Sequence, residues 1–141
     1  MSEMGALEGV RVVDAGLLVQ GPRAALMLAD FGADVIKVEP PSGEPIRQRQ
    51  EVSRGSAVPF AMLNQNKRDM TLNLKSEEGK DILRRLVADA DVLVENYAPG
   101  VMDRLGIGYE AMQKINPRLI YGSGSGYGIS GPDMNRQAMD I

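Results

Sequence analysis

The stretch Arg11–Glu39, RVVDAGLLVQGPRAALMLADFGADVIKVE, decides the fold class, because a strand, a helix and a second strand follow one another along it. Arg11–Asp14 is a short apolar run typical of a buried strand. Pro22 suits the first turn of a helix, where its missing N–H has no partner to lose, and apolar residues then recur at steps of three and four. Gly32 is placed to end that helix, and Ala33–Glu39 is a second β-rich run. The stretch therefore predicts a strand–helix–strand unit of a parallel sheet.

The same alternation continues toward the C-terminus. The predicted elements are, in order, a strand at 70–74, a helix capped by Ser76, a strand at 91–95, short helices at 99–105 and 109–115, and a strand at 118–121. Strands that alternate with helices at this spacing predict an α/β fold with a doubly wound parallel sheet. Residues 40–58 mix proline, glycine, serine and charges, so we expect an irregular loop with a function there.

Composition narrows the classes of function. The 141 residues are 43% hydrophobic and 25% charged, which is typical of one globular domain. They include no cysteine and no histidine, which excludes disulfides, thiolate nucleophiles and imidazole bases from their chemistry. A net charge of −3 disfavours a nucleic-acid partner, and no apolar run approaches the length of a membrane span, so neither partner is expected. The absence of cysteine is in keeping with a cytoplasmic protein.

One glycine motif invites a nucleotide interpretation. Gly126–Gly131 matches G-x-G-x-x-G, which binds a pyrophosphate when it directly joins a strand to a helix. Here the preceding strand ends several residues earlier, and Pro132–Asn135 does not open an apolar-periodic helix. We therefore expect a glycine loop rather than a dinucleotide site, and we interpret Glu39 as a solvated strand end rather than a ribose-binding acid.

Cations lie near several predicted strand ends. Lys67 and Arg68 precede the third strand, Lys75 follows it, Arg104 follows the fourth, and Arg136 lies after the fifth. The carboxyl ends of parallel strands share one edge, where ligands of such folds bind. Cations that converge there would suit a polyphosphate. Ordinary surface charge is the alternative, and spacing alone leaves both interpretations open.

A series of motifs resembles the family III CoA-transferases, which include formyl-CoA transferase, carnitine-CoA transferase and α-methylacyl-CoA racemase. The resemblance runs from about Leu7 to the last residue, in the order 7–14, 21–22, 28–39, 64–68, 72–75, 94–100, 104–106 and 116–120. It implies a Rossmann-like doubly wound sheet. Members of that family are longer than this chain, so residues 1–141 are expected to be the N-terminal part of the CoA-binding large domain.

The resemblance also implies a reaction. Members move CoA from an acyl-CoA to a carboxylic acid through an aspartyl-CoA intermediate, without metal and without a permanently bound cofactor. They form interlocked homodimers. The position of the nucleophilic aspartate falls after residue 141, so no catalytic residue is expected in these residues. Asp140 matches a neighbouring position of the substrate pocket and is not interpreted as the nucleophile.

The residues expected to contact coenzyme A follow from the same resemblance, position by position. Val19 and Gln20 would line the thiol end. Adenine, ribose and phosphates would be held by Leu72, Lys75, Asn96, Tyr97, Ala98 and Arg104. The pantetheine arm would pass Arg136, Gln137, Ala138 and Met139. The residue types agree with these roles, because a tyrosine ring stacks on adenine and cations bind phosphate.

The sequence departs from the family pattern at three places. Pro40 stands where a member has a cation, with Arg47 or Arg49 as the expected substitute. Val19 stands where formyl-CoA transferase has an active-site glutamine, which argues against formate and oxalate as substrates. Met139 replaces the histidine that carries a proton in the racemases, and a thioether cannot exchange protons. The sequence thus predicts a CoA-transferase. An acyl-CoA racemase or epimerase that uses other acids and bases, and a non-catalytic CoA-binding fragment, remain as alternatives.

Overall fold

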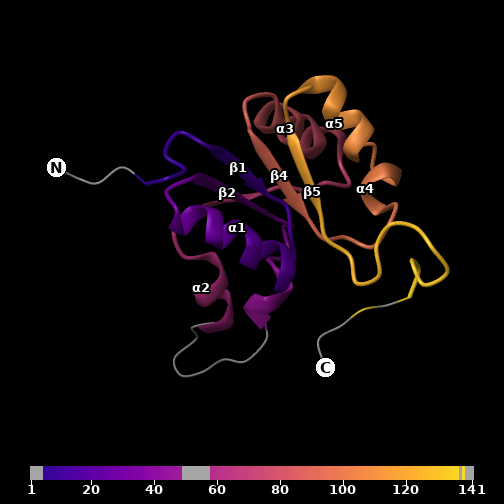
Figure 1. Cartoon of the computed structure of the whole chain (residues 1–141), viewed down its shortest axis with the longest axis horizontal. Helices are drawn as coiled ribbons and strands as arrows, with labels where there is room; N and C mark the ends of the chain where they lie inside the picture. The colour runs from indigo at the N-terminus through magenta and orange to yellow at the C-terminus, as the bar shows by residue number, and fades with distance from the viewer. Residues whose placement is uncertain (1–4, 49–57, 137, 139–141) are drawn as a thin grey trace.

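The computed structural model describes residues 5–48, 58–136 and 138, and its centre is a five-stranded parallel sheet (Figure 1). The strands run in the order β3-β2-β1-β4-β5, with neighbours paired in parallel. Their bounds are β1 Arg11–Asp14, β2 Asp34–Glu39, β3 Lys67–Thr71, β4 Val92–Glu95 and β5 Ile120–Ser123. The predicted α/β class and doubly wound sheet are confirmed.

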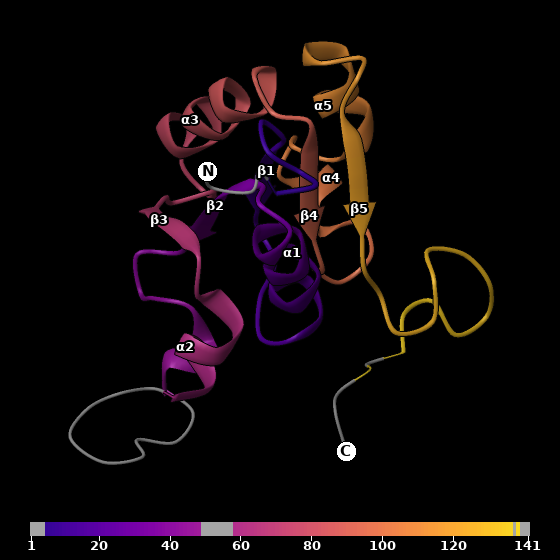
Figure 2. The same ribbon diagram turned by 60° about the vertical axis from the view of Figure 1, so that its left-hand side comes forward.

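Helices cover both faces of this sheet, as Figure 2 shows. One face carries α1 (Gln20–Asp30) and α2 (Val58–Asn64), and the other carries α3 (Glu77–Ala88), α4 (Val101–Arg104) and α5 (Tyr109–Ile115). A short 3₁₀ helix, η1 (Pro45–Gln48), follows β2. The chain changes face after β3, which makes the junction of β1 and β4 the switch point of the sheet. Ligands of open α/β folds bind at the carboxyl ends of the strands beside such a point.

The core has one part on each side of the sheet, because successive residues of a strand face opposite sides. Val12 of β1 packs with Ala25 and Val35 under α1, whereas Val13 packs with Leu83 and Leu93 under α3. Each of these side chains is at most 2% exposed. The alternation along β1 thus joins the two halves of the core.

Two predicted strands have shifted bounds. The third was expected at 70–74, but β3 covers Lys67–Thr71, because it pairs from Val35↔Lys67 to Glu39↔Thr71. The apolar residues Leu72 and Leu74 pack on the core just after the strand, so their alternation reflects burial rather than strand pairing. The fifth was expected at 118–121 and is found at Ile120–Ser123. Helix α2 was not predicted.

The start of α3 was predicted correctly. Ser76 has an extended backbone, and its Oγ accepts a hydrogen bond from the Gly79 N–H at 3.1 Å. Glu77 and Glu78 lie in the first turn, where the helix dipole favours acids. Gly79 itself is packed against the preceding loop, since a Cβ there would lie 2.1 Å from the carbonyl oxygen of Asn73. The cap therefore depends on a residue without a side chain.

We expect Gly79→Ala to lower the free energy of unfolding, although alanine favours a helix interior over glycine by about 1 kcal/mol. The added methyl would overlap the Asn73 carbonyl, and this backbone cannot move without disturbing the Ser76 cap. Overpacking of this kind costs roughly 1–3 kcal/mol, which urea unfolding can measure. The matched control is Glu78→Ala, one residue earlier and exposed. A Gly79→Ala variant more stable than the parent would contradict the close contact.

Candidate functional site

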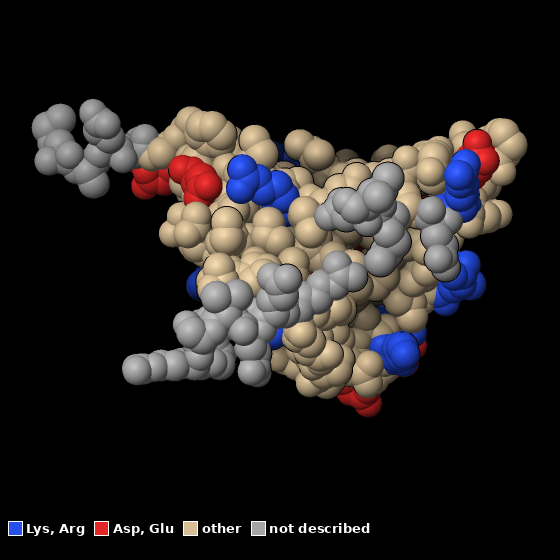
Figure 3. Space-filling model, turned by 90° about the horizontal axis from the view of Figure 1, so that it is seen from below, with Lys and Arg blue, Asp and Glu red and all other residues tan. Residues whose placement is uncertain are grey.

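A cavity of about 530 Å³ lies at the carboxyl edge of β1, β4 and β5, beside the switch point of the sheet. Figure 3 looks onto this edge, where most of the visible surface is neither acidic nor basic. The walls come from the segments that follow these strands. They are Leu18, Gln20, Asn96, Tyr97, Ala98, Pro99, Arg104, Gly124, Ser125, Gly126, Met134, Asn135, Arg136 and Ala138.

Many of the residues expected to contact CoA line this one cavity, although they come from distant parts of the sequence. They are Gln20, Asn96, Tyr97, Ala98, Arg104, Arg136 and Ala138. Resemblance alone did not single out Leu18, Pro99, Ser125 or Met134, which also line it. The glycine-rich run after β5 was a signal for part of this wall, since Gly124 and Gly126 belong to it.

Other predicted residues lie apart from the cavity lining. Leu72 is 6% exposed and packs in the core under α3, so only its backbone is available to a ligand. Lys75 is exposed in the loop before α3, and Val19 is 39% exposed at the start of α1. Gln137, Met139 and Asp140 lie outside the described residues, as does Arg49.

The expectation that Lys67 and Arg68 precede β3 is wrong, and neither residue lines the cavity. Both belong to the strand. The Lys67 side chain is 1% exposed and donates to Asp14 Oδ2 at 2.8 Å and to the Pro22 carbonyl at 2.8 Å. Burial lowers the pKa of Lys67, while Asp14 opposes that shift. Arg68 forms a two-pronged ion pair with exposed Asp34, at 2.6 and 2.8 Å. Neither cation is available at the cavity.

Arg47 does not act as the substitute for the cation missing at Pro40. Its guanidinium binds Glu39 at 2.5 and 2.8 Å and Asp69 at 2.8 Å, and it lies 3.4 Å from the centre of the Phe60 ring. Glu39 is only 3% exposed, so its interpretation as a solvated strand end is also wrong. Because Arg47 is held by two carboxylates and a ring, it joins β2, β3 and α2, although its side chain is 39% exposed.

The carboxylates of Glu39 and Asp69 have opposite pKa shifts. Burial alone would raise the pKa of Glu39, but hydrogen bonds from Arg47, Asp69 and the backbone N–H of Glu44 outweigh it and bring the pKa to about 2. Burial and the hydrogen bond with Glu39 raise the pKa of Asp69 from its ordinary 3.8 to about 6. Asp69 therefore shares its proton with Glu39 in mildly acidic solution.

This pair gives an expected pH dependence of stability. A raised folded-state pKa means that the contribution of Asp69 is present below its ordinary pKa of 3.8 and is lost as the pH rises through about 6. Asp69→Asn keeps a donor toward Glu39 at every pH and removes this loss. In urea unfolding, we compare the free energy of unfolding of the parent with that of the variant. We expect the difference, parent minus variant, to decrease as the pH rises from 4 to 7. Parallel pH profiles for the two proteins would contradict the shared proton.

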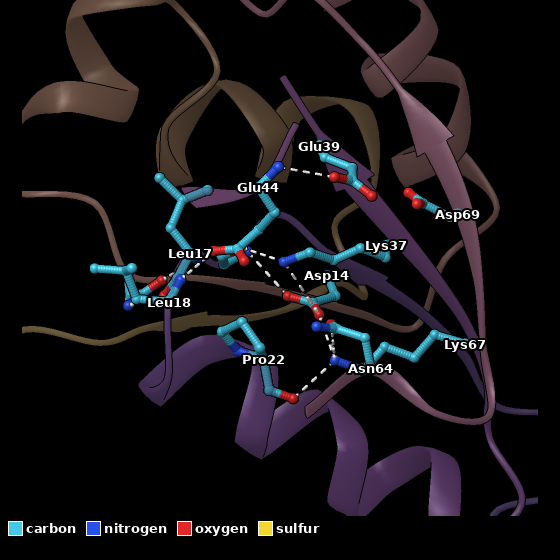
Figure 4. Close-up of polar contacts among 12 residues, drawn as sticks. Asp14, Leu17, Leu18, Pro22, Lys37, Glu39, Glu44, Asn64, Lys67 and Asp69 are labelled. Carbon is cyan, nitrogen blue, oxygen red and sulfur yellow. Dashed lines mark hydrogen bonds and ion pairs between the residues drawn. The ribbon is translucent and has the colours of Figure 1, made fainter. Parts of the chain in front are cut away.

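The loop between β1 and α1 is held from several sides, as the close-up in Figure 4 shows. Asn96, at the end of β4, contacts both backbone groups of Leu17: its Oδ1 accepts the Leu17 N–H at 2.7 Å and its Nδ2 donates to the Leu17 carbonyl at 3.0 Å. A Cβ at Gly21 would lie 2.8 Å from Gly16 Cα and 2.9 Å from Asn96 Oδ1. Glycine is therefore required where the loop, α1 and β4 meet.

A second cavity of about 460 Å³ adjoins the first, and both are lined by Tyr97 and Met134. Tyr109 and Tyr121 also line it and meet edge to face, with ring centres 5.8 Å apart. Burial is the main cause that raises the pKa of Tyr121. The two cavities thus share part of their lining at the same edge of the sheet.

The G-x-G-x-x-G segment is confirmed as a loop. Residues 124–136 contain turns and bends and no helix, so no helix N-terminus faces a ligand there. Gly128 and Gly131 have φ values of +83° and +97°, which favour glycine. Within the described ranges, no cluster of acids suitable for a metal ion is found. No described helix is long and apolar enough to cross a membrane.

A family model described as CoA-transferase family III matches residues 7–141, and the chain belongs to this family. The chain is 50% identical over 125 residues to a formyl-CoA:oxalate CoA-transferase of Afipia carboxidovorans. This aligned region covers 87% of this chain and 30% of that protein. It is 41% identical to an acyl-CoA transferase of Fusarium pseudograminearum, covering 99% of this chain and 33% of that protein.

Solved structures agree with this assignment. A CaiB/BaiF family protein from Brucella suis superposes with a TM-score of 0.90 at 41% identity, covering 95% of this chain and 37% of that one. The predicted family and fold are thus confirmed. The chain spans about a third of the length of the curated relatives that it matches.

Proposed function

We propose that this protein is a CoA-transferase that moves CoA between an acyl-CoA thioester and a carboxylic acid. The observation that carries the proposal is the convergence of seven residues, expected from family resemblance, on one cavity at the switch point. Because the chain spans about a third of its relatives, we also propose that residues 1–141 are the N-terminal part of a larger CoA-binding domain.

The proposed reaction uses a carboxylate nucleophile that follows residue 141 in the full-length protein. An aspartate oxygen attacks the thioester carbonyl, the C–S bond breaks, and an acyl–aspartyl anhydride and a CoA thiolate form. The thiolate attacks the aspartyl carbonyl, which releases the donor acid and leaves an aspartyl-CoA thioester. The acceptor carboxylate then repeats the two steps in reverse and leaves as the new acyl-CoA. No metal and no permanently bound cofactor take part.

The described residues would supply binding rather than covalent chemistry. Tyr97 offers a ring face to adenine, and Arg104 and Arg136 offer charge to the phosphates. The Arg136 guanidinium lies 5.4 Å from the centre of the Tyr127 ring, so this exposed tail residue already has a partner that orients it. Gln20 would lie toward the thiol end. We further propose a cytoplasmic enzyme that forms an interlocked homodimer.

The acids exchanged are proposed only as a class. The Afipia relative is named formyl-CoA:oxalate CoA-transferase, and the Fusarium relative is named acyl-CoA transferase. In this chain Val19 occupies the position expected of a glutamine in a formyl-CoA transferase. This departure disfavours formate and oxalate as the acids exchanged, although Val19 itself lies apart from the lining of the cavity.

The covalent intermediate gives a direct test of the reaction. We expect mass spectrometry of the full-length protein, after incubation with candidate acyl-CoAs, to find CoA attached to an aspartate beyond residue 141. The adduct should disappear with hydroxylamine, which cleaves thioesters. Free CoA, which carries no acyl group to activate the carboxylate, is the control. Consumption of acyl-CoA without any adduct would contradict covalent transfer, and exchange of the α-proton with deuterium would favour the racemase alternative.

The role of Arg104 can be measured separately from turnover. We expect Arg104→Ala to weaken CoA binding in calorimetry by about tenfold or more, because a charge-assisted hydrogen bond contributes roughly 1.5–3 kcal/mol. Arg118→Ala is the matched control, since this exposed arginine precedes β5 at the opposite edge of the sheet. Equal affinities of the parent and the Arg104→Ala variant would remove Arg104 from the phosphate site.

A further inference from the structure

The loop at Ala15–Val19 has its backbone groups fixed by partners from β1, β2, β4 and the segment before η1. The Ala15 N–H donates to the Val94 carbonyl at 2.9 Å, and the Gly16 N–H donates to Asp14 Oδ1 at 2.9 Å. The Gly16 carbonyl accepts from Lys37 Nζ. Together with the two bonds from Asn96, four consecutive peptide units are held by atoms outside the loop or at its start.

Glu44 completes this arrangement at the most strained position. Leu18 has a φ of +61°, in the left-handed region that a leucine rarely adopts. Its N–H donates to Glu44 Oε1 at 2.5 Å, and the other oxygen of Glu44 accepts from the Ile46 N–H at 2.9 Å. Strained backbone persists only where the surroundings fix it, and such positions cluster at functional sites. Glu44 therefore links the conformation of Leu18 to that of η1.

The charged groups that hold the loop are almost completely buried. Asp14 and Glu44 are 0% exposed and Lys37 is 1% exposed. Asp14 Oδ2 lies 3.7 Å from Lys37 Nζ and 2.8 Å from Lys67 Nζ. Buried ion pairs contribute little net stability compared with apolar side chains of the same size, because desolvation offsets the attraction. Their effect here is to fix one loop conformation, since Lys37 donates to the loop and Asp14 accepts from it.

The loop leads directly into the cavity. Leu18 and Gln20 both line it. Gln20 packs against the glycine loop after β5, where a Cβ at Gly124 would lie 2.8 Å from Gln20 Oε1. Arg104 and Tyr97 belong to the segments after β4, whereas Leu18 and Gln20 belong to the segment after β1. The cavity therefore has a β1 side and a β4 side, and Lys37 and Glu44 hold the loop on the β1 side.

We propose that Glu44 and Lys37 are positioning residues that preform the β1 side of the cavity for the pantetheine and thioester end of CoA. The proposal rests on the proposed function, because it assigns the nucleotide end of CoA to Tyr97 and Arg104. Neither residue touches the cavity itself. Each acts through the backbone of Gly16 or Leu18, which sets where Leu18 and Gln20 lie.

The test compares two ligands that share one end. Coenzyme A contains the adenosine 3′,5′-bisphosphate unit, to which it adds a second 5′-phosphate and the pantetheine arm. In calorimetry of the full-length protein, we expect Glu44→Met and Lys37→Met to weaken CoA binding by about tenfold while changing bisphosphate binding by less than about twofold. For each variant we compare the ratio of its affinity for CoA to its affinity for the bisphosphate. An unfolded fraction of the protein does not change this ratio, because calorimetry fits the number of binding sites separately from the affinity.

Two further variants separate positioning from stability. Leu83→Ala removes a fully buried side chain under α3, on the other side of the sheet, and should leave the ratio of the two affinities as in the parent. Glu44→Gln keeps an oxygen that accepts the Leu18 N–H, so its ratio should lie closer to that of the parent than the ratio of Glu44→Met does. This rescue would support a role through Leu18.

The outcomes are distinguishable. If the parent binds both ligands and the methionine variants weaken both equally, or weaken neither, positioning by Glu44 and Lys37 is wrong and the proposed function stands. A ratio changed equally by Leu83→Ala would also overturn it, since general destabilisation would then explain the effect. If the parent binds neither ligand, the proposed function fails, and this inference fails with it. Should Glu44→Met not fold, Lys37→Met provides the same readout through the Gly16 carbonyl.

Discussion

The carboxylate of Asp14 is the point at which three strands and a helix are joined. It closes β1, and its two oxygens receive the Gly16 N–H and the ammonium groups of Lys67 and, more distantly, Lys37. Lys67 also reaches the carbonyl of Pro22 in α1. Without this carboxylate, two buried ammonium groups would keep only uncharged oxygens as partners, namely the carbonyls of Gly16 and Pro22 and the side chain of Asn64. Through Lys67, this one charge is thus linked to α1, which provides part of one wall of the cavity.

The regular parts of the fold were predictable from the sequence because they depend on local rules. The apolar run of β1, the cap at Ser76 and the bounds of α5 follow from periodicity and capping chemistry, and the structure has them where expected. The bounds of β3 were not predictable in this way. It is an edge strand, mostly exposed, and pairing with β2 rather than its own pattern sets its ends.

The buried charges show where the sequence reasoning missed a signal that was present. Val35, Lys37 and Glu39 occupy alternate positions of β2, so a lysine and a glutamate share the face of a valine that is 1% exposed. This alternation alone indicates that the side chains of Lys37 and Glu39 are buried, whereas Glu39 was interpreted as solvated. The partners of these charges were out of reach, because Arg47 approaches Glu39 only through the path of the chain around η1, and Asp14 approaches Lys37 only through the pairing of β1 with β2. Family resemblance found much of the cavity lining, but it could not tell that Leu72 turns its side chain into the core.

The two edges of the sheet differ in how readily they accept another strand. The β3 edge has the run Lys67, Arg68 and Asp69, and all three charges are engaged with neighbours. Charged edge strands resist pairing with a further chain. The β5 edge, Ile120–Ser123, contains no charged residue, and Ile120 is 65% exposed. A strand added to this sheet would therefore pair with β5 rather than with β3. It would then lie beside the strands β1, β4 and β5, whose carboxyl ends border the cavity.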